Sequence, residues 1–139
     1  MRLVLDASVA VKWYAPEDET REALEIADAA QRGQLLLVAP DILLSEFGHT
    51  LRKAVLVGLP RENARALFNV IPRMVELLPS VDFGQDALEL AMLAGGSFYD
   101  ALYVALSERQ NLRVVTADSR MIKAFDRTGR CVHVKDFKF

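Results

Sequence analysis

Ser97-Phe-Tyr-Asp-Ala-Leu-Tyr-Val-Ala-Leu-Ser-Glu108 is predicted to form a helix that is apolar on most of its surface. Gly95 and Gly96 end whatever element precedes it, and Ser97 is a suitable N-cap because its hydroxyl accepts an amide of the first turn. Asp100 stands in the capping-box position, near the positive end of the helix dipole. Taken alone, this carboxylate indicates only the start of a helix. Whether Asp100 also has a functional role depends on where the other carboxylates of the chain lie.

Short buried strands alternate with helices on both sides of this stretch. Strands are expected at residues 2–5, 35–38, 75–78, 114–116 and 131–134. Further helices are expected at residues 16–32, 42–57, 61–71, 83–94 and 121–127. Pro72 is expected to end the helix before it, and Asp41 and Asp82 are expected to cap the helices after them. The alternation predicts one α/β domain over residues 1–139, a parallel-sheet α/β/α sandwich.

Two carboxylates directly follow predicted strands. Asp6 comes after Leu3-Val4-Leu5, and Asp118 comes two residues after Val114-Val115-Thr116. The carboxyl ends of parallel strands share one edge of the sheet, where α/β proteins bind ligands. Asp100 joins this edge because it starts a helix, whereas Glu46 reaches it only if its own helix packs alongside. The plainer alternatives are a turn or cap for Asp6 and a boundary position for Glu46.

Four acids gathered at one edge indicate a metal site. Like charges repel and raise one another's pKa, and a hard divalent cation removes that cost. Mg²⁺ or Mn²⁺ can lower the pKa of a bound water, and a pair of such ions can clamp both oxygens of an in-line phosphoryl displacement. His49 lies on the Glu46 helix and His133 in a strand far from the acids, so both are interpreted as structural.

Composition and charge limit the remaining classes of function. The chain has 139 residues, 52% of them hydrophobic, and no apolar run long enough to span a bilayer. The single Cys131 excludes an intramolecular disulfide and a cysteine-cluster metal site, and a cytoplasmic protein without a membrane partner is expected. Net charge is −2, but residues 109–139 carry eight Lys and Arg against three Asp. Arg120 and Lys123, just after Asp118, are therefore candidates for binding phosphate groups, with ordinary solvated surface as the alternative.

Four segments together resemble a known family: Val4–Ser8, Leu43–Glu46, Tyr99–Glu108 and Val115–Asp118. In order and spacing they are similar to the PIN-domain ribonucleases, and most closely to the VapC-type toxins of toxin–antitoxin modules. The resemblance implies a Mg²⁺- or Mn²⁺-dependent endoribonuclease with Asp6, Glu46, Asp100 and Asp118 in its site. It also implies that Ser8 and Thr116 support the site by hydrogen bonding, that the protein is a homodimer, and that a cognate antitoxin inhibits it.

Several alternatives to a toxin stay open. A PIN nuclease of RNA maturation or decay has the same signature. A receiver-type phosphoacceptor domain needs adjacent acids after its first strand, but Ala7 follows Asp6. An inactive binding module is disfavoured by four intact acids. Residues 42–57 and 67–78 have more apolar positions than one buried face requires, which predicts exposed surfaces for partners.

Overall fold

The computed structural model describes residues 1–15 and 18–139 and contains a sheet of five parallel strands. Its strand order is β3-β2-β1-β4-β5, and every neighbouring pair is parallel. The predicted strands are confirmed, with ends that differ by no more than two residues. Their bounds are β1 (Arg2–Leu5), β2 (Leu36–Pro40), β3 (Val75–Leu78), β4 (Val114–Thr116) and β5 (Cys131–His133).

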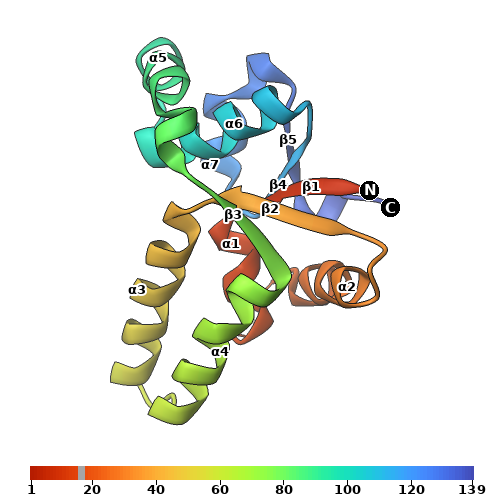
Figure 1. The fold of residues 1–139 in the computed structure, drawn as a ribbon, viewed down its shortest axis with the longest axis vertical. Coiled ribbons are helices and arrows are strands. Elements are labelled where there is room, and N and C mark those ends of the chain that lie inside the picture. Colours follow the sequence, from red (N-terminus) through yellow and green to blue (C-terminus); the bar gives the residue numbers. More distant parts are fainter. Residues whose placement is uncertain (16–17) are drawn as a thin grey trace.

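Helices cover both faces of this sheet, as Figure 1 shows. On one side lie α1 (Ala7–Ala10), α2 (Thr20–Gln31), α3 (Ile42–Leu56) and α4 (Arg61–Met74). On the other lie α5 (Gly84–Ala94), α6 (Phe98–Gln110) and α7 (Ser119–Ala124). Short 3₁₀ turns complete the described elements: η1 (Val11–Trp13), η2 (Ser80–Asp82), η3 (Asp126–Thr128) and η4 (Val134–Asp136). The predicted α/β/α sandwich is confirmed.

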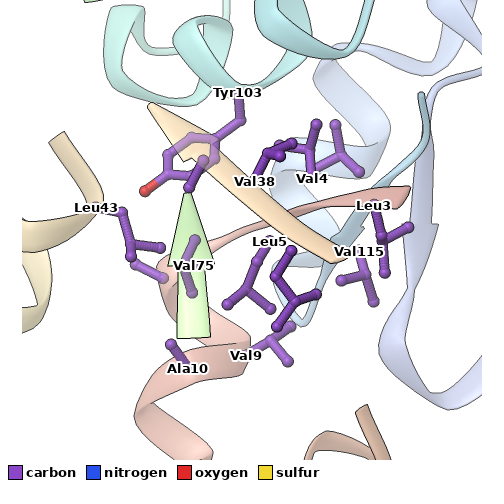
Figure 2. Packing of buried hydrophobic residues seen from close by; sticks show 14 of the residues in the cluster. Leu3, Val4, Leu5, Val9, Ala10, Val38, Leu43, Val75, Tyr103 and Val115 are labelled. Carbon is purple, nitrogen blue, oxygen red and sulfur yellow. The ribbon is translucent and has the colours of Figure 1, made fainter. Parts of the chain in front are cut away.

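The core lies where α6 crosses the middle of the sheet. Residues 101–107 of α6 are all buried, because the helix packs on β1, β2 and β4 on one side and on α5 on the other. This double packing explains why the helix is apolar nearly all round. Beneath it, buried residues of β1 meet those of neighbouring elements, among them Val9, Val38, Val75 and Val115 (Figure 2). No single described helix is long and apolar enough to cross a bilayer; α5 and α6 reach that length only as a pair bent by 118°.

The prediction that Pro72 ends a helix is wrong. Helix α4 continues through Pro72 to Met74, and β3 begins at the next residue. The amide of Val75 donates to the carbonyl of Ile71, which closes the turn beyond the proline. Proline removes only its own hydrogen bond, and this close to the helix end that loss is tolerated.

The predicted caps at Asp41 and Asp82 are also wrong. Neither side chain bonds an amide of its helix. The Asp41 carboxylate instead accepts from the hydroxyl and amide of Ser80, tying the start of α3 to the segment after β3. Asp82 lies in η2, its carbonyl oxygen accepts from Arg109 Nη1 at 2.6 Å, and α5 begins at Gly84. At Asp41 a tertiary partner has replaced the local capping bond. At Asp82 the reason is different: α5 starts further on, and Phe83 occupies the N-cap position.

Two other helix boundaries differ from the predictions. The helix expected from Pro16 begins at Thr20 in the described part of the chain, directly after Glu19 in the left-handed region, whereas the expected start lies outside the described residues. The helix expected at 121–127 begins at Ser119 and ends at Ala124. Helix α1 was not expected as a separate element, and it follows β1 after a single residue, Asp6.

Candidate active site at the carboxyl edge of the sheet

The site lies where the strand order reverses. Strand β1 is followed in sequence by β2 on one side, while β4 pairs with its other side. Such a switch point opens a crevice at the carboxyl ends of the strands. Asp6 and Asp118 follow these two strands. Helix α6 leads into β4 through a short loop, so its first turn, with Asp100, lies near the same edge.

Asp6 is held by two hydroxyl groups. Its carboxylate is buried, and its Oδ2 accepts from Ser8 Oγ at 2.5 Å and from Thr116 Oγ1 at 2.7 Å. These hydroxyls are fixed in turn by amides: Ala117 N donates to Ser8 Oγ at 2.9 Å, and Asp118 N donates to Thr116 Oγ1 at 3.0 Å. The two hydroxyl oxygens also lie 3.2 Å apart, but their bonds to Asp6 are shorter, and an ionised carboxylate can only accept, so each hydroxyl donates to Asp6. The structure thus places Ser8 and Thr116 where a supporting role requires them.

Asp118 caps α7 and lies beside a basic side chain. Its Oδ1 accepts from the amide of Arg120 at 2.9 Å, and Arg120 Nε lies 3.8 Å from the same oxygen. The Arg120 side chain is 96% exposed, so it can turn towards a ligand. Lys123 lies about one turn further along α7 and lines a hollow between α5 and α7 with Leu93 and Arg127. The structure brings Arg120 to the acids and places Lys123 in this neighbouring hollow.

Asp100 and Glu46 come from two different helices. The amide of Asp100 donates to Ser97 Oγ at 3.0 Å, which confirms the predicted cap of α6. Glu46 lies in α3, is half-buried, and its Oε1 accepts from the hydroxyl of Tyr103 at 2.7 Å. Glu46 was expected to reach the carboxyl edge of the sheet only if its helix packs alongside. Its hydrogen bond to Tyr103 of α6 shows that α3 does so.

The acids influence one another electrostatically. Burial raises the pKa of Asp6, and the charge of Asp118 adds to this against the hydrogen bonds from Ser8 and Thr116. Burial likewise raises the pKa of Glu46, with further contributions from the charges of Asp6 and Asp100. The pKa of Asp100 is raised by burial first and then by Asp6 and Asp118. All four predicted acids thus belong to one cluster with excess negative charge.

This cluster fits a hydrated divalent cation. Within residues 1–15 and 18–139, no three Asp, Glu, His or Cys side chains converge closely enough to chelate an ion on their own. Mg²⁺ commonly binds through one or two carboxylates and keeps several waters, so it does not need such convergence. Burial and the neighbouring carboxylates both disfavour the ionised forms of Asp6 and Asp100, and a bound cation would offset that cost. Of the two histidines, His133 accepts the amide of Lys135 through Nδ1, and His49 is exposed on α3.

Sequence reasoning missed Tyr103 as a site residue. Its place in an apolar helix indicates only a core position, and Tyr103 is indeed fully buried. Its hydroxyl nevertheless contacts Glu46. Tyr103 lies three residues after Asp100, which puts the two on the same side of the helix. That spacing was the signal that could have identified it.

Comparison with known proteins identifies the family. The PIN domain family matches residues 3–128. The chain belongs to the PIN-domain family. This PIN domain is 30% identical over 131 residues to Ribonuclease VapC3 of Pyrobaculum aerophilum, a match that covers 90% of this chain and 95% of that protein. The expected resemblance to VapC-type proteins is confirmed, and the family places the chain outside the receiver-type signalling domains.

Solved structures share the fold of this PIN domain. The crystal structure of PAE2754 from Pyrobaculum aerophilum matches with a TM-score of 0.71 and 20% identity, over 97% of this chain and 85% of that one. A toxin–antitoxin complex from Klebsiella pneumoniae matches with a TM-score of 0.66 and 13% identity, over 99% of each chain. At these identities the likeness concerns the fold alone.

Proposed function

We propose that this PIN domain is a Mg²⁺- or Mn²⁺-dependent endoribonuclease and the toxin of a type II toxin–antitoxin module. The observation that carries the proposal is the buried Asp6, held by Ser8 and Thr116 at the switch point and surrounded by the charges of Glu46, Asp100 and Asp118. The similarity to a protein named Ribonuclease VapC3 supports it.

Each residue has a defined part in this proposal. Asp6, Asp100 and Asp118 hold the ion, with Glu46 as a further or water-mediated ligand. When bound, Mg²⁺ or Mn²⁺ lowers the pKa of water and neutralises charge on the phosphate. Ser8 and Thr116 favour the ionised form of Asp6 and fix its orientation, because both donate to the same carboxylate oxygen. Arg120 is exposed beside Asp118 and binds the RNA backbone, together with Lys123.

The described nucleophiles favour hydrolysis by water over a covalent intermediate. Burial raises the pKa of the Cys131 thiol to about 12, so it stays protonated at neutral pH. The Ser8 hydroxyl donates to Asp6 and accepts from Ala117, which commits it to the support of the site. Neither group is prepared to attack phosphorus.

The enzymatic part is tested with purified protein and a fluorescently labelled single-stranded RNA. Cleavage is expected to stop in EDTA, to return with Mg²⁺ or Mn²⁺, and to be lost in Asp6→Asn. Cleavage that persists in EDTA, or in Asp6→Asn, would require a different mechanism.

Two separate apolar surfaces support two protein partners, an antitoxin and a second copy of the chain. A groove between α3 and α4 is lined by Leu51, Val55 and Phe68, with Arg52 and Arg65 beside them. It suits the apolar face of an antitoxin helix. Helix α5 separately exposes Leu88, Met92 and Leu93. Exposed apolar clusters of this kind usually mark interfaces.

The toxin role is tested in cells. Expression of the chain alone is expected to arrest growth, and co-expression of the neighbouring small gene is expected to relieve the arrest. The arrest must need Asp6. If the chain is harmless and light scattering finds a monomer, the housekeeping PIN nuclease of RNA maturation or decay replaces the toxin.

A further inference from the structure

Helix α6 contributes two side chains to the acid cluster, and they differ in character. Asp100 is half-exposed at the first turn, whereas Tyr103, one turn later, is fully buried in the core. Figure 2 shows the Tyr103 ring extending from α6 towards the sheet, with its hydroxyl pointing towards the neighbouring helix, on which Leu43 lies. That helix is α3, and the hydroxyl donates to Glu46 Oε1 at 2.7 Å.

We propose that Tyr103 is a positioning residue that fixes the Glu46 carboxylate beside Asp6 and Asp100 and leaves its second oxygen, Oε2, for the water or ion of the site. The inference rests on the proposed nuclease function. It adds to the proposed active site a residue that is not one of the four acids. Tyr103 itself touches neither substrate nor ion.

The electrostatics of Glu46 explain why it needs an anchor. The negative charges of Asp6 and Asp100 act on the Glu46 carboxylate, and three side-chain torsions leave a glutamate free to turn away from them. The hydrogen bond from Tyr103 opposes both effects, because it favours the ionised carboxylate and restricts its rotation. Without it, Glu46 would gain by moving towards solvent.

The surroundings of Tyr103 suit it to this task. The ring is held among core residues, so the hydroxyl has a fixed position. The hydroxyl lies 2.7 Å from Glu46 Oε1, and because a carboxylate oxygen can only accept, the phenol is the donor. A buried phenol also needs a hydrogen-bond acceptor simply to be stable in the core. Experiment has to separate this structural role from the positioning of Glu46.

Tyr103→Phe removes the hydroxyl and keeps the ring. Groups that orient a metal ligand typically contribute about 10–100-fold to metal affinity or activity. We expect Tyr103→Phe to weaken Mn²⁺ binding, measured by calorimetry, and to lower kcat for RNA by about 10–100-fold, with a smaller change in KM. The matched control is Ser107→Ala, which removes another buried hydroxyl from α6, one that donates to the carbonyl of Val104. Ser107→Ala is expected to change neither Mn²⁺ affinity nor kcat.

A double-mutant cycle separates positioning from a structural role. If Tyr103 acts through Glu46, adding Tyr103→Phe to Glu46→Gln causes no further loss of Mn²⁺ affinity. Losses that multiply in the double variant overturn the proposal, and so does unchanged Mn²⁺ affinity in Tyr103→Phe. Thermal unfolding of each variant shows whether it is folded; if Tyr103→Phe unfolds, the affinity lost in Glu46→Gln relative to wild type decides whether Glu46 contributes at all, and no loss overturns the proposal.

The cycle also distinguishes this inference from the proposed function. If wild-type protein binds Mn²⁺ but cleaves no RNA, the nuclease proposal fails while the affinity cycle still decides the role of Tyr103. If RNA is cleaved and the cycle is additive, the nuclease proposal stands and the positioning role is lost.

Discussion

The acid cluster has two halves that are built differently. The sheet half consists of four residues at or just after the carboxyl ends of β1 and β4, namely Asp6, Ser8, Thr116 and Asp118. Here backbone amides fix two hydroxyls, and the hydroxyls fix the carboxylate of Asp6. The helix half consists of Glu46, Asp100 and Tyr103, which come from α3 and α6. Its geometry depends on how two helices pack and on one hydrogen bond between side chains.

The two halves differ in what sets their geometry: strand pairing in one, helix packing in the other. Strand pairing sets the spacing of β1 and β4, so the sheet half needs only the register of neighbouring strands. The helix half needs the whole sandwich to be assembled before Glu46 meets Tyr103. We therefore expect damage to the hydroxyl network of the sheet half to lower stability as well as activity. Loss of a carboxylate charge, or damage to the helix half, is expected to lower activity with less loss of stability.

The largest effect is expected for Asp6→Asn in the sheet half. Loss of this charge is expected to lower kcat by about 100–1,000-fold, because electrostatic stabilisation of the transition state is lost. The melting temperature should stay equal or rise, since burial and Asp118 raise the pKa of Asp6 and the buried charge costs stability. Steady-state kinetics and thermal unfolding measure both. A large loss of stability would show that Asp6 holds the fold together.

The next effect concerns the hydroxyl network. Thr116→Val leaves Asp6 with one hydroxyl donor and the amide of Asp118 without its acceptor. Burying an unsatisfied group typically costs about 1–3 kcal/mol, and urea denaturation should find a loss of this size. Ser107→Ala is the matched control in α6 and is expected to cost clearly less. Equal losses in the two variants would mean that the network has no special role.

A smaller effect is expected in the pH dependence of stability without metal. A carboxyl group whose pKa is raised in the folded state binds its proton more tightly there than in the unfolded chain. In EDTA, the stabilising contribution of Asp6, Glu46 and Asp100 is complete below their ordinary pKa values and is lost as the pH rises through the raised ones. Urea denaturation at several pH values should find this slope reduced in Asp6→Asn. Mn²⁺ should restore stability at neutral pH. If the unfolding free energy depends on pH equally in Asp6→Asn and wild type, Asp6 is not the source of that dependence.

The smallest effect is expected at the basic residues of α7. Each phosphate contact with single-stranded nucleic acid contributes about 0.7 to the logarithmic salt slope of binding. Arg120→Ala should reduce the slope by about this amount, because Arg120 lies beside Asp118. Lys123→Ala should reduce it less, because Lys123 lines the hollow next to α5. If neither variant changes the slope, this surface is merely solvated.

Local reasoning failed at three helix ends, for different reasons. Asp41 and Asp82 carry the expected capping signal, but Ser80 takes the side chain of Asp41, and α5 starts beyond Asp82. Pro72 carries a stop signal that α4 passes because the helix ends within the next turn. A side-chain cap contributes about 1 kcal/mol, which the contact of Asp41 with Ser80 readily offsets.

The sequence by itself determined the parallel sandwich, because buried strands that alternate with helices have few other ways to cover both faces of a sheet. It also determined that Asp6 and Asp118 share an edge, because carboxyl ends of parallel strands coincide. Only the tertiary structure decided that Glu46 reaches this edge and that Tyr103 holds it there. Helical periodicity places a residue on a face of its own helix, but the partner of that face is set by packing between elements far apart in the chain.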